Sequence, residues 1–217
     1  AMGALGIRTD LSLADAAAML NETGVAYVDQ AHYAPPLAAL LPLRRELGLR
    51  TGLSAAEKLV NPFRATVQFV GAHHGPYLAP LAEALRLLGS PRGVVIQGSE
   101  GSVDIAPGHS ARVIRASGGE SAEELVDPSA FGVTEKSLPP AEDAPAHAAL
   151  ITRILEDASA PGAQAAAFNA GLWLAWSGQA ASPSDGVARA RALLERGAAA
   201  EALAALIRFS AARAQPA

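Results

Sequence analysis

The chain has 217 residues, half of them hydrophobic, which is enough to build a full core without metal or disulfide cross-links. It contains no cysteine, so a disulfide scaffold, a thiolate metal site and a cysteine nucleophile are excluded. The formal net charge of −4 and the isoelectric point near 5.7 argue against a protein that coats nucleic acid through its overall field.

The first 47 residues contain helix signals on either side of a strand signal. A capping box, Ser12–Asp15, opens a helix that Gly24 ends. The run Val25–Asp29 predicts a short buried strand. Pro35-Pro36 suits the first turn of a helix, where backbone N–H groups need no partner. This helix has an apolar face made of Leu37, Leu40, Leu41 and Leu47.

A βαβ pattern follows. Thr66–Val70 predicts a strand, and a loop with His73-His74-Gly75 leads into a helix with regularly spaced leucines that reaches Gly89. Gly93–Gln97 predicts the next strand. Strands that alternate with helices at this spacing imply a parallel sheet with right-handed crossovers.

The pattern changes after residue 102. Val103–Ile105 and Ala111–Arg115 are strand signals separated by the turn pair Pro107-Gly108, which predicts an antiparallel hairpin. Residues 117–147 are polar and rich in proline and glycine, which predicts a connection. Three or four helices are predicted beyond it, at roughly 147–157, 162–177, 184–196 and 198–213.

These signals predict an α/β fold with a mostly parallel sheet, right-handed βαβ crossovers, an antiparallel edge hairpin and a helical C-terminal region. We expect residues 1–217 to form a single α/β domain, with residues 117–147 as a connection within it. No internal repeat period is evident.

Five segments carry a family resemblance, in a consistent order and spacing. They are Arg44–Thr51, Asn61-Pro62, Pro80–Gly89, Asp127–Gly132 and Phe168–Gly171. Each resembles a segment of the anthranilate phosphoribosyltransferases, which belong to glycosyltransferase family 3. The resemblance covers nearly the whole chain and implies a nucleoside-phosphorylase-like fold, with a small helical domain from the start of the chain and a large α/β domain behind it.

The resemblance also implies which part of the family this chain corresponds to. In the family, a glycine-rich loop that ends in aspartate binds the donor's pyrophosphate, and its position lies upstream of the first residue here. We therefore expect the carboxyl-side portion, without the N-terminal helical segment or the phosphate loop, and no catalysis by this chain alone. Gly118-Gly119 lies between two candidate antiparallel strands, so we expect a tight turn there.

The resemblance gives Arg44 a candidate role. It matches the family arginine that pairs with the acceptor's carboxylate, and a guanidinium offers two parallel donors to a carboxylate. The alternative is a surface arginine at a helix end, where positive charge is favourable. The surroundings depart from the family, because Ala34 stands where a histidine is expected and Glu57-Lys58 replaces a Gly-Pro of the acceptor pocket. Both interpretations of Arg44 stay open.

The resemblance also places a candidate metal site. The family holds magnesium on the donor's pyrophosphate with adjacent Asp and Glu residues. Here these positions are Val103 and Asp104, so one carboxylate is lost, and Glu100 in a nearby turn is the candidate replacement. The alternative is that both acids are simply solvated. We expect no cofactor on this chain, and magnesium only if the intact protein is an active transferase. The adjacent pair His73-His74 should point apart and lacks a third ligand, so we expect no metal there.

Three segments are similar to a divergent branch of the family: Lys58–Phe63, Gly98–Gly101 and Ser184–Arg189. Members of that branch keep the transferase fold, lack the transferase activity and include nucleic-acid-binding proteins. Our first hypothesis is therefore a non-enzymatic relative that binds nucleic acid or another phosphorylated ligand. The candidate acceptor- or polyanion-binding residues are Arg44, Arg45, Arg50, Lys58, Asn61 and Arg64.

Two further hypotheses stay open. One is an active phosphoribosyltransferase of tryptophan biosynthesis in its intact form, which moves ribose phosphate onto the amine of an aromatic acid. The other is an interaction module that covers an open sheet edge by forming a homo-oligomer, such as a dimer. No apolar run approaches the roughly 20 residues of a membrane-spanning helix, so we expect no membrane partner. The absence of cysteine and of an export signal favours the cytoplasm.

Overall fold

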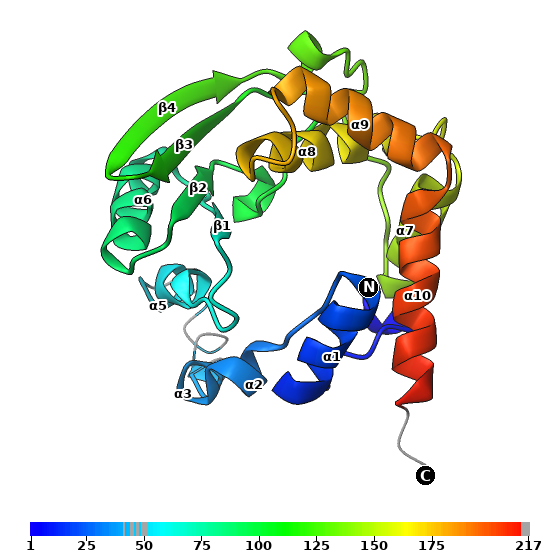
Figure 1. Cartoon of the computed structure of the whole chain (residues 1–217), viewed down its shortest axis with the longest axis horizontal. Coiled ribbons are helices and arrows are strands. Elements are labelled where there is room, and N and C mark those ends of the chain that lie inside the picture. Colours follow the sequence, from blue (N-terminus) through cyan, green and yellow to red (C-terminus); the bar gives the residue numbers. More distant parts are fainter. Residues whose placement is uncertain (41, 44–45, 47, 49–51, 214–217) are drawn as a thin grey trace. The chain divides into compact units, whose positions relative to one another are not determined.

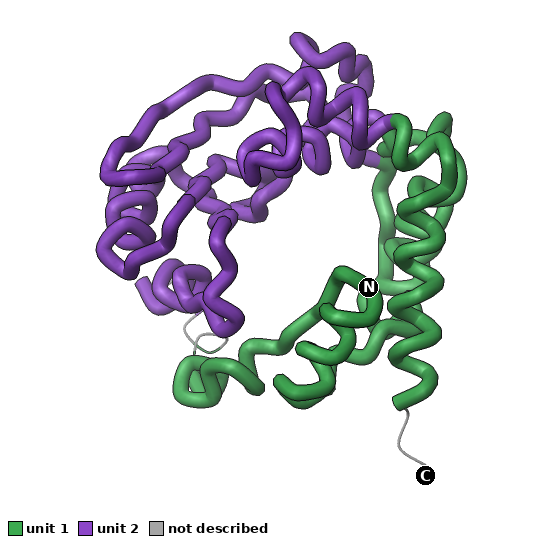
Figure 2. The backbone as a smooth tube through the Cα atoms, viewed as in Figure 1, with its two compact units in different colours: residues 1–47, 139–163, 192–217 green, residues 48–138, 164–191 purple. Residues whose placement is uncertain are grey.

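The computed structural model describes residues 1–40, 42–43, 46, 48 and 52–213. They divide into two compact units (Figure 2). Unit 1 comprises Ala1–Leu47, Pro139–Ala163 and Ala192–Ala217, and unit 2 comprises Gly48–Leu138 and Gln164–Arg191. The sequence led us to expect a single domain. The buried apolar residues that the structure describes collect into separate cores, one of them made by unit 1 residues alone, and the single domain stays a prediction.

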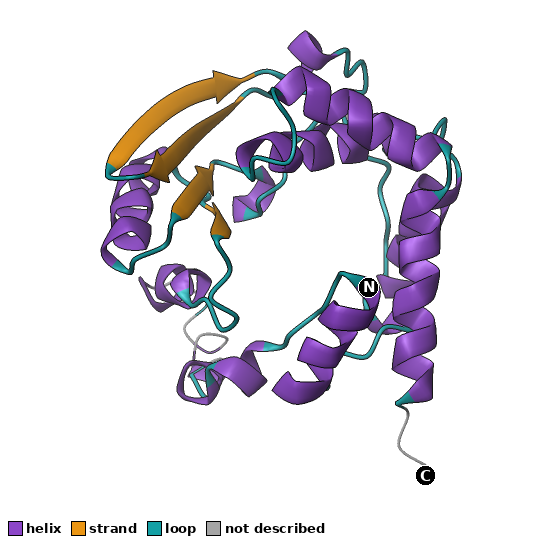
Figure 3. Ribbon diagram, viewed as in Figure 1, coloured by secondary structure: helices purple, strands orange, loops and turns teal. Residues whose placement is uncertain are grey.

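Unit 2 contains a four-stranded sheet with the strand order β1-β2-β3-β4 (Figures 1 and 3). The strands are β1 (Val67–Gly71), β2 (Arg92–Ile96), β3 (Ala111–Ser117) and β4 (Glu120–Val126). β1 and β2 are parallel and are joined through α6 (Leu78–Leu87), whereas the β2–β3 and β3–β4 pairs are antiparallel. The predicted α/β class is confirmed, although the sheet is mixed and has one parallel pair among the described residues.

The predictions of two strands are wrong. Val25–Asp29 is irregular, because the described elements of unit 1 are helices and offer no strand to pair with. Val103–Ile105 is also irregular, because the side chain of Asn169 takes both backbone hydrogen-bonding groups of Ile105. The hairpin partner of β3 is β4, which lies inside the stretch predicted as a connection. Gly118-Gly119 forms the tight turn between them, with φ angles of 61° and 89° that suit glycine.

The sheet of unit 2 is covered on both faces. On one face Val94, Ile96 and Val113 pack with α8 (Ala163–Trp176), which contributes Phe168, Leu172 and Trp176. On the other face Val95 and Ile114 pack with the leucines of α6. Neighbouring residues of β2 and of β3 thus enter opposite cores, as the period of two along a strand requires. α9 (Pro183–Glu195) adds Val187 to the first core.

Unit 1 is helical. Its core combines residues of η1 (Gly3–Leu5), α1 (Leu13–Thr23), α7 (Ala144–Glu156) and α10 (Ala198–Ala212). The predicted capping box is confirmed, since the Ser12 hydroxyl accepts a hydrogen bond from the Asp15 amide and Gly24 ends α1 in a left-handed conformation. The short helices α2 (Gln30–Tyr33) and α3 (Pro35–Ala38) follow. Among the described helices, none has the length and apolar character to span a bilayer.

Candidate functional site

The candidate site lies at the carboxyl ends of the parallel strands β1 and β2, the edge where open α/β sheets bind ligands. The loop after β2, residues 97–104, contains both acids that the sequence singles out, and we call it the acidic loop. Its centre is a single helical turn, η4 (Ser99–Gly101). The Ser99 amide donates to the Asp104 carbonyl at 2.8 Å, so the loop folds back on itself.

The backbone of the acidic loop is strained at Glu100, which has a left-handed φ of 52° and ψ of 21°. This conformation costs a residue with a Cβ roughly 1–2 kcal/mol. Arg64 is the other described non-glycine residue with positive φ. Strained residues cluster at ligand sites, because surrounding contacts must hold them in place.

Two glycines allow the acidic loop to lie directly against the end of β1. A Cβ on Gly71 would be 2.1 Å from the Ser102 carbonyl oxygen and 2.3 Å from that of Gly101. A Cβ on Gly98 would also be 2.1 Å from the Ser102 oxygen. All three distances are far below van der Waals contact, so each of the two positions requires glycine.

Asn169, on α8, anchors the far end of the acidic loop. Its side chain accepts from the Ile105 amide at 2.8 Å and donates to the carbonyl oxygens of Ile105 and Ala165, both at 3.0 Å. Asn169 is 7% exposed, so these bonds are shielded from water. The sequence marked the segment Phe168–Gly171 by resemblance but did not single out Asn169. Asn169 is the one polar side chain between Ala165 and Trp176 of α8, and a lone polar residue in such an apolar stretch was the available signal.

Lys58 anchors the near end of the acidic loop. It lies in η2 (Glu57–Leu59), which follows α5 (Gly52–Ala56). Its ammonium group donates to the Gly71 carbonyl at 2.8 Å and to the Gly101 carbonyl at 2.7 Å. The structure therefore places Lys58, a predicted polyanion-binding residue, in contact with the backbone at the candidate site.

The remaining predicted binding residues are only partly described. The Asn61 side chain bonds both the amide and the carbonyl of Ala65, at 2.8 and 3.0 Å, and so closes a turn. Arg64 is exposed in that turn, at the opposite end of β1 from the acidic loop. Arg44, Arg45 and Arg50 lie outside the described residues.

The two acids of the loop differ in their surroundings. Asp104 is exposed as a residue, yet loss of hydration at its carboxylate raises the pKa, and the hydrogen bond with Ser102 only partly opposes this. Glu100 is also exposed. The described residues contain no group of three or more His, Cys, Asp or Glu side chains that could hold a metal ion. The expectation that His73 and His74 point apart is wrong, because their rings meet nearly edge to face with centroids 4.4 Å apart.

Replacing Asp104 with asparagine is expected to raise the thermal stability at neutral pH. Since the folded-state pKa is above the unfolded value, the native state binds the proton more tightly, and stability falls as pH rises through the folded pKa. Asparagine is uncharged, so it avoids the free-energy cost of a poorly hydrated carboxylate. Thermal unfolding from about pH 3 to about pH 7 should show the variant's advantage growing with pH.

Asp10→Asn is the matched control for this prediction. Arg8 lowers the pKa of Asp10, so the wild-type carboxylate is favoured at high pH and the variant should show no gain there. A pH-independent advantage of Asp104→Asn would contradict the prediction.

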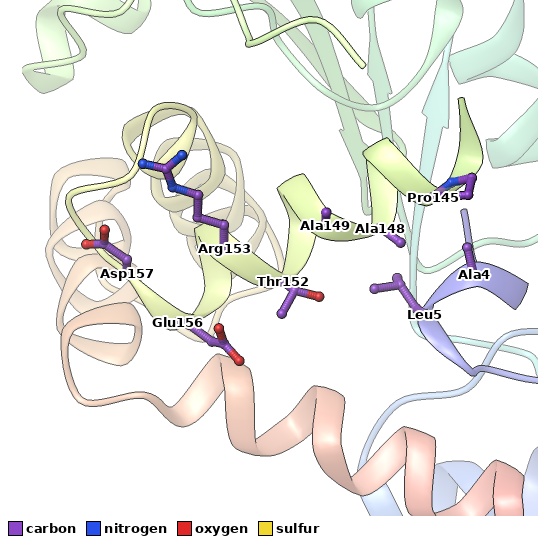
Figure 4. Close-up of a pocket in the computed structure, with 9 residues that line it drawn as sticks. All are labelled: Ala4, Leu5, Pro145, Ala148, Ala149, Thr152, Arg153, Glu156 and Asp157. Atoms are coloured by element: carbon purple, nitrogen blue, oxygen red, sulfur yellow. The ribbon is translucent and has the colours of Figure 1, made fainter. Parts of the chain in front are cut away.

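Unit 1 has a separate hollow of about 540 Å³ between η1 and α7 (Figure 4). Leu5, Ala148 and Ala149 form an apolar part, Arg153 and Glu156 lie further along α7, and Asp157 directly follows its end. The lining includes neither histidine nor the acids that the sequence analysis proposed. The acidic loop is therefore the better candidate for a functional site than this hollow.

Comparison with known proteins shows which family the chain belongs to. Residues 1–200 match the model described as "Glycosyl transferase family, a/b domain", and the chain belongs to this family. It is 35% identical over 201 residues to the anthranilate phosphoribosyltransferase of Azorhizobium caulinodans. The matched region covers 91% of this chain and 58% of that protein. The Thermosynechococcus vestitus enzyme of the same name is 33% identical over 206 residues, and this match covers 93% of the chain and 61% of that enzyme.

Solved structures give the same result for the fold. The anthranilate phosphoribosyltransferase (TrpD) of Thermus thermophilus matches with a TM-score of 0.84 and 29% identity, covering 97% of this chain and 63% of that one. The Saccharomyces cerevisiae protein "in complex with PRPP and Mg" matches with a TM-score of 0.78 at 14% identity, which shows the fold alone. The chain thus spans about three fifths of the length of these relatives, and the predicted family resemblance is confirmed.

Proposed function

We propose that this chain provides the α/β portion of a phosphoribosyltransferase that transfers ribose phosphate from phosphoribosyl pyrophosphate to anthranilate. The observation that carries this proposal is the 35% identity to the A. caulinodans enzyme along 91% of the chain. The position of the acidic loop, at the ligand-binding edge of the sheet, supports it.

The proposed reaction is a displacement at the anomeric carbon. The amine nitrogen of anthranilate forms a bond to that carbon, the bond to the pyrophosphate oxygen breaks, and pyrophosphate leaves with the electron pair while the amine loses a proton. Catalysis then depends on position and on stabilisation of the charge that develops on the leaving group.

The acids of the loop fit a magnesium ion that arrives with the donor. Magnesium bound to substrate phosphates needs only one or two protein carboxylates, and Asp104 and Glu100 supply two on one short loop. When bound, the ion would neutralise charge on the leaving pyrophosphate. The loop's own contribution is to present these carboxylates at a fixed place on the sheet edge.

The test is an assay of the full native gene product with phosphoribosyl pyrophosphate, anthranilate and magnesium. We expect the donor to be consumed, and Asp104→Asn to reduce the rate about 100-fold, the usual effect of removing one electrostatic contact to developing charge. Asp10→Asn, a surface acid of the Arg8 ion pair, should leave the rate unchanged. No consumption of the donor by the wild-type protein would contradict the proposal.

A second candidate is a non-enzymatic relative that binds a polyanion. It is favoured by Val103, which stands beside Asp104 where the family has a second acid. In that case donor consumption would be absent, and DNA affinity would fall by about 0.7–0.9 log units per phosphate contact per log unit of salt. A flat salt response would rule it out. Nucleic acid as a ligand and a homo-oligomeric state both stay predictions.

A further inference from the structure

We propose that Lys58 is a positioning residue, whose ammonium group holds the acidic loop against the end of β1 and thereby sets the position of Glu100. Only its consequence for catalysis rests on the proposed function. The proposal assigns Lys58 a role different from the direct phosphate contact that the sequence suggested.

Lys58 runs alongside β1. Its backbone carbonyl accepts from the Gln68 side chain at 3.2 Å, near the start of the strand, whereas its ammonium group reaches the carbonyl of Gly71, the last residue of the strand. Gln68 is fixed in turn, because its side chain accepts from the Ser90 hydroxyl at 2.9 Å. Leu59, the next residue, packs against the α6 side of the sheet core. The backbone carbonyl and the ammonium group of Lys58 are therefore both bonded to β1.

The two carbonyls that Lys58 joins belong to the two halves of the site. Gly71 ends β1, and Gly101 directly follows the strained Glu100 in the acidic loop. A charged donor makes stronger hydrogen bonds to carbonyl oxygens than a neutral one. This contact, together with the close backbone approach at Gly71, holds the loop in a conformation that Glu100 would otherwise leave.

The acidic loop has a second anchor at its other end. Asn169 bonds the backbone of Ile105, which follows Asp104. Removal of the Lys58 contact should therefore release the Glu100 side of the loop while the Ile105 side stays fixed. This local pattern distinguishes a positioning role from a general effect on stability.

Lys58→Met tests the proposal, because methionine is of similar length and has no donor. Amide hydrogen exchange in the intact chain should become at least tenfold faster at Gly101 and Ser102, whose amides bond within the loop at 3.1 and 2.9 Å. Exchange at Ile105 and in β3 should stay at the wild-type rate. Lys58→Arg, which retains donors, should restore slow exchange, and Lys136→Met, at an exposed lysine elsewhere in unit 2, should have no effect.

Two outcomes would overturn the proposal: unchanged exchange in the acidic loop of Lys58→Met, or equal acceleration at Ile105 and in β3. In the full-length transferase, the KM for phosphoribosyl pyrophosphate should rise about tenfold while that for anthranilate stays constant. The two proposals fail separately. A loosened loop with an inactive wild-type protein supports the positioning role and contradicts the transferase. An unchanged loop with an active wild-type protein supports the transferase and contradicts the positioning role.

Discussion

Gly171→Ala is expected to lower the free energy of unfolding of unit 2 by about 3 kcal/mol or more, because the added methyl group has no space. A Cβ at Gly171 would lie 2.4 Å from both the backbone nitrogen and the Cα of Val187. The approach is reciprocal, since a Cβ at Gly186 would lie 2.1 Å from the Gly171 carbonyl oxygen. Backbone cannot move aside as a side-chain tip can, so α8 and α9 must separate and open the core that contains Val187.

Urea unfolding measures this effect, and Gly52→Ala is the control. Gly52 begins α5 in the same unit, has no atom within 4 Å of an added Cβ and has no positive φ. It should change the stability by no more than about 0.5 kcal/mol. Wild-type stability in Gly171→Ala would mean that the two helices do not meet at these glycines.

Asn169→Leu is expected to lower the free energy of unfolding by about 3 kcal/mol, because it leaves buried polar groups unpaired. Leucine has a similar size but neither accepts from the Ile105 amide nor donates to the carbonyls of Ile105 and Ala165. Each buried group left without a partner costs roughly 1–3 kcal/mol. The same change releases the residue that follows Asp104, so the proposed transferase activity should fall as well.

Gln164→Leu provides the matched amide-to-leucine control on the same helix. The Gln164 side chain accepts from the amide and the hydroxyl of Thr134, at 2.8 and 3.1 Å, in an exposed position. Water can replace those bonds, so the loss should stay near 1 kcal/mol or below. Equal losses in the two variants, again measured by urea unfolding, would contradict a special role for the buried amide.

The position of the candidate site depends on residues that are far from it in sequence. Lys58 bonds Gly101 in the acidic loop, and Asn169 bonds Ile105 directly after it; the two anchors are 43 and 64 residues from these partners. Variation at the anchors is therefore expected to alter function without any change in the carboxylates.

Local patterns in the sequence were enough to predict several of the elements. The capping box at Ser12, the leucine spacing of α6 and the four helices at the C-terminal end depend on contacts between residues a few positions apart, and the structure has them where they were predicted. Family membership was also readable, because the five matching segments keep their order.

Other features depend on contacts between residues far apart in the sequence. Val103–Ile105 has the composition of a strand, yet Asn169 on a distant helix takes its hydrogen bonds and keeps it out of the sheet. β4 has a polar composition, yet it forms a strand because β3 lies beside it across a glycine turn. Lys58 resembles a solvated surface lysine until the fold brings two carbonyl oxygens to its ammonium group. In each case the hydrogen-bond partner is non-local, and no pattern within a short window of sequence can specify it.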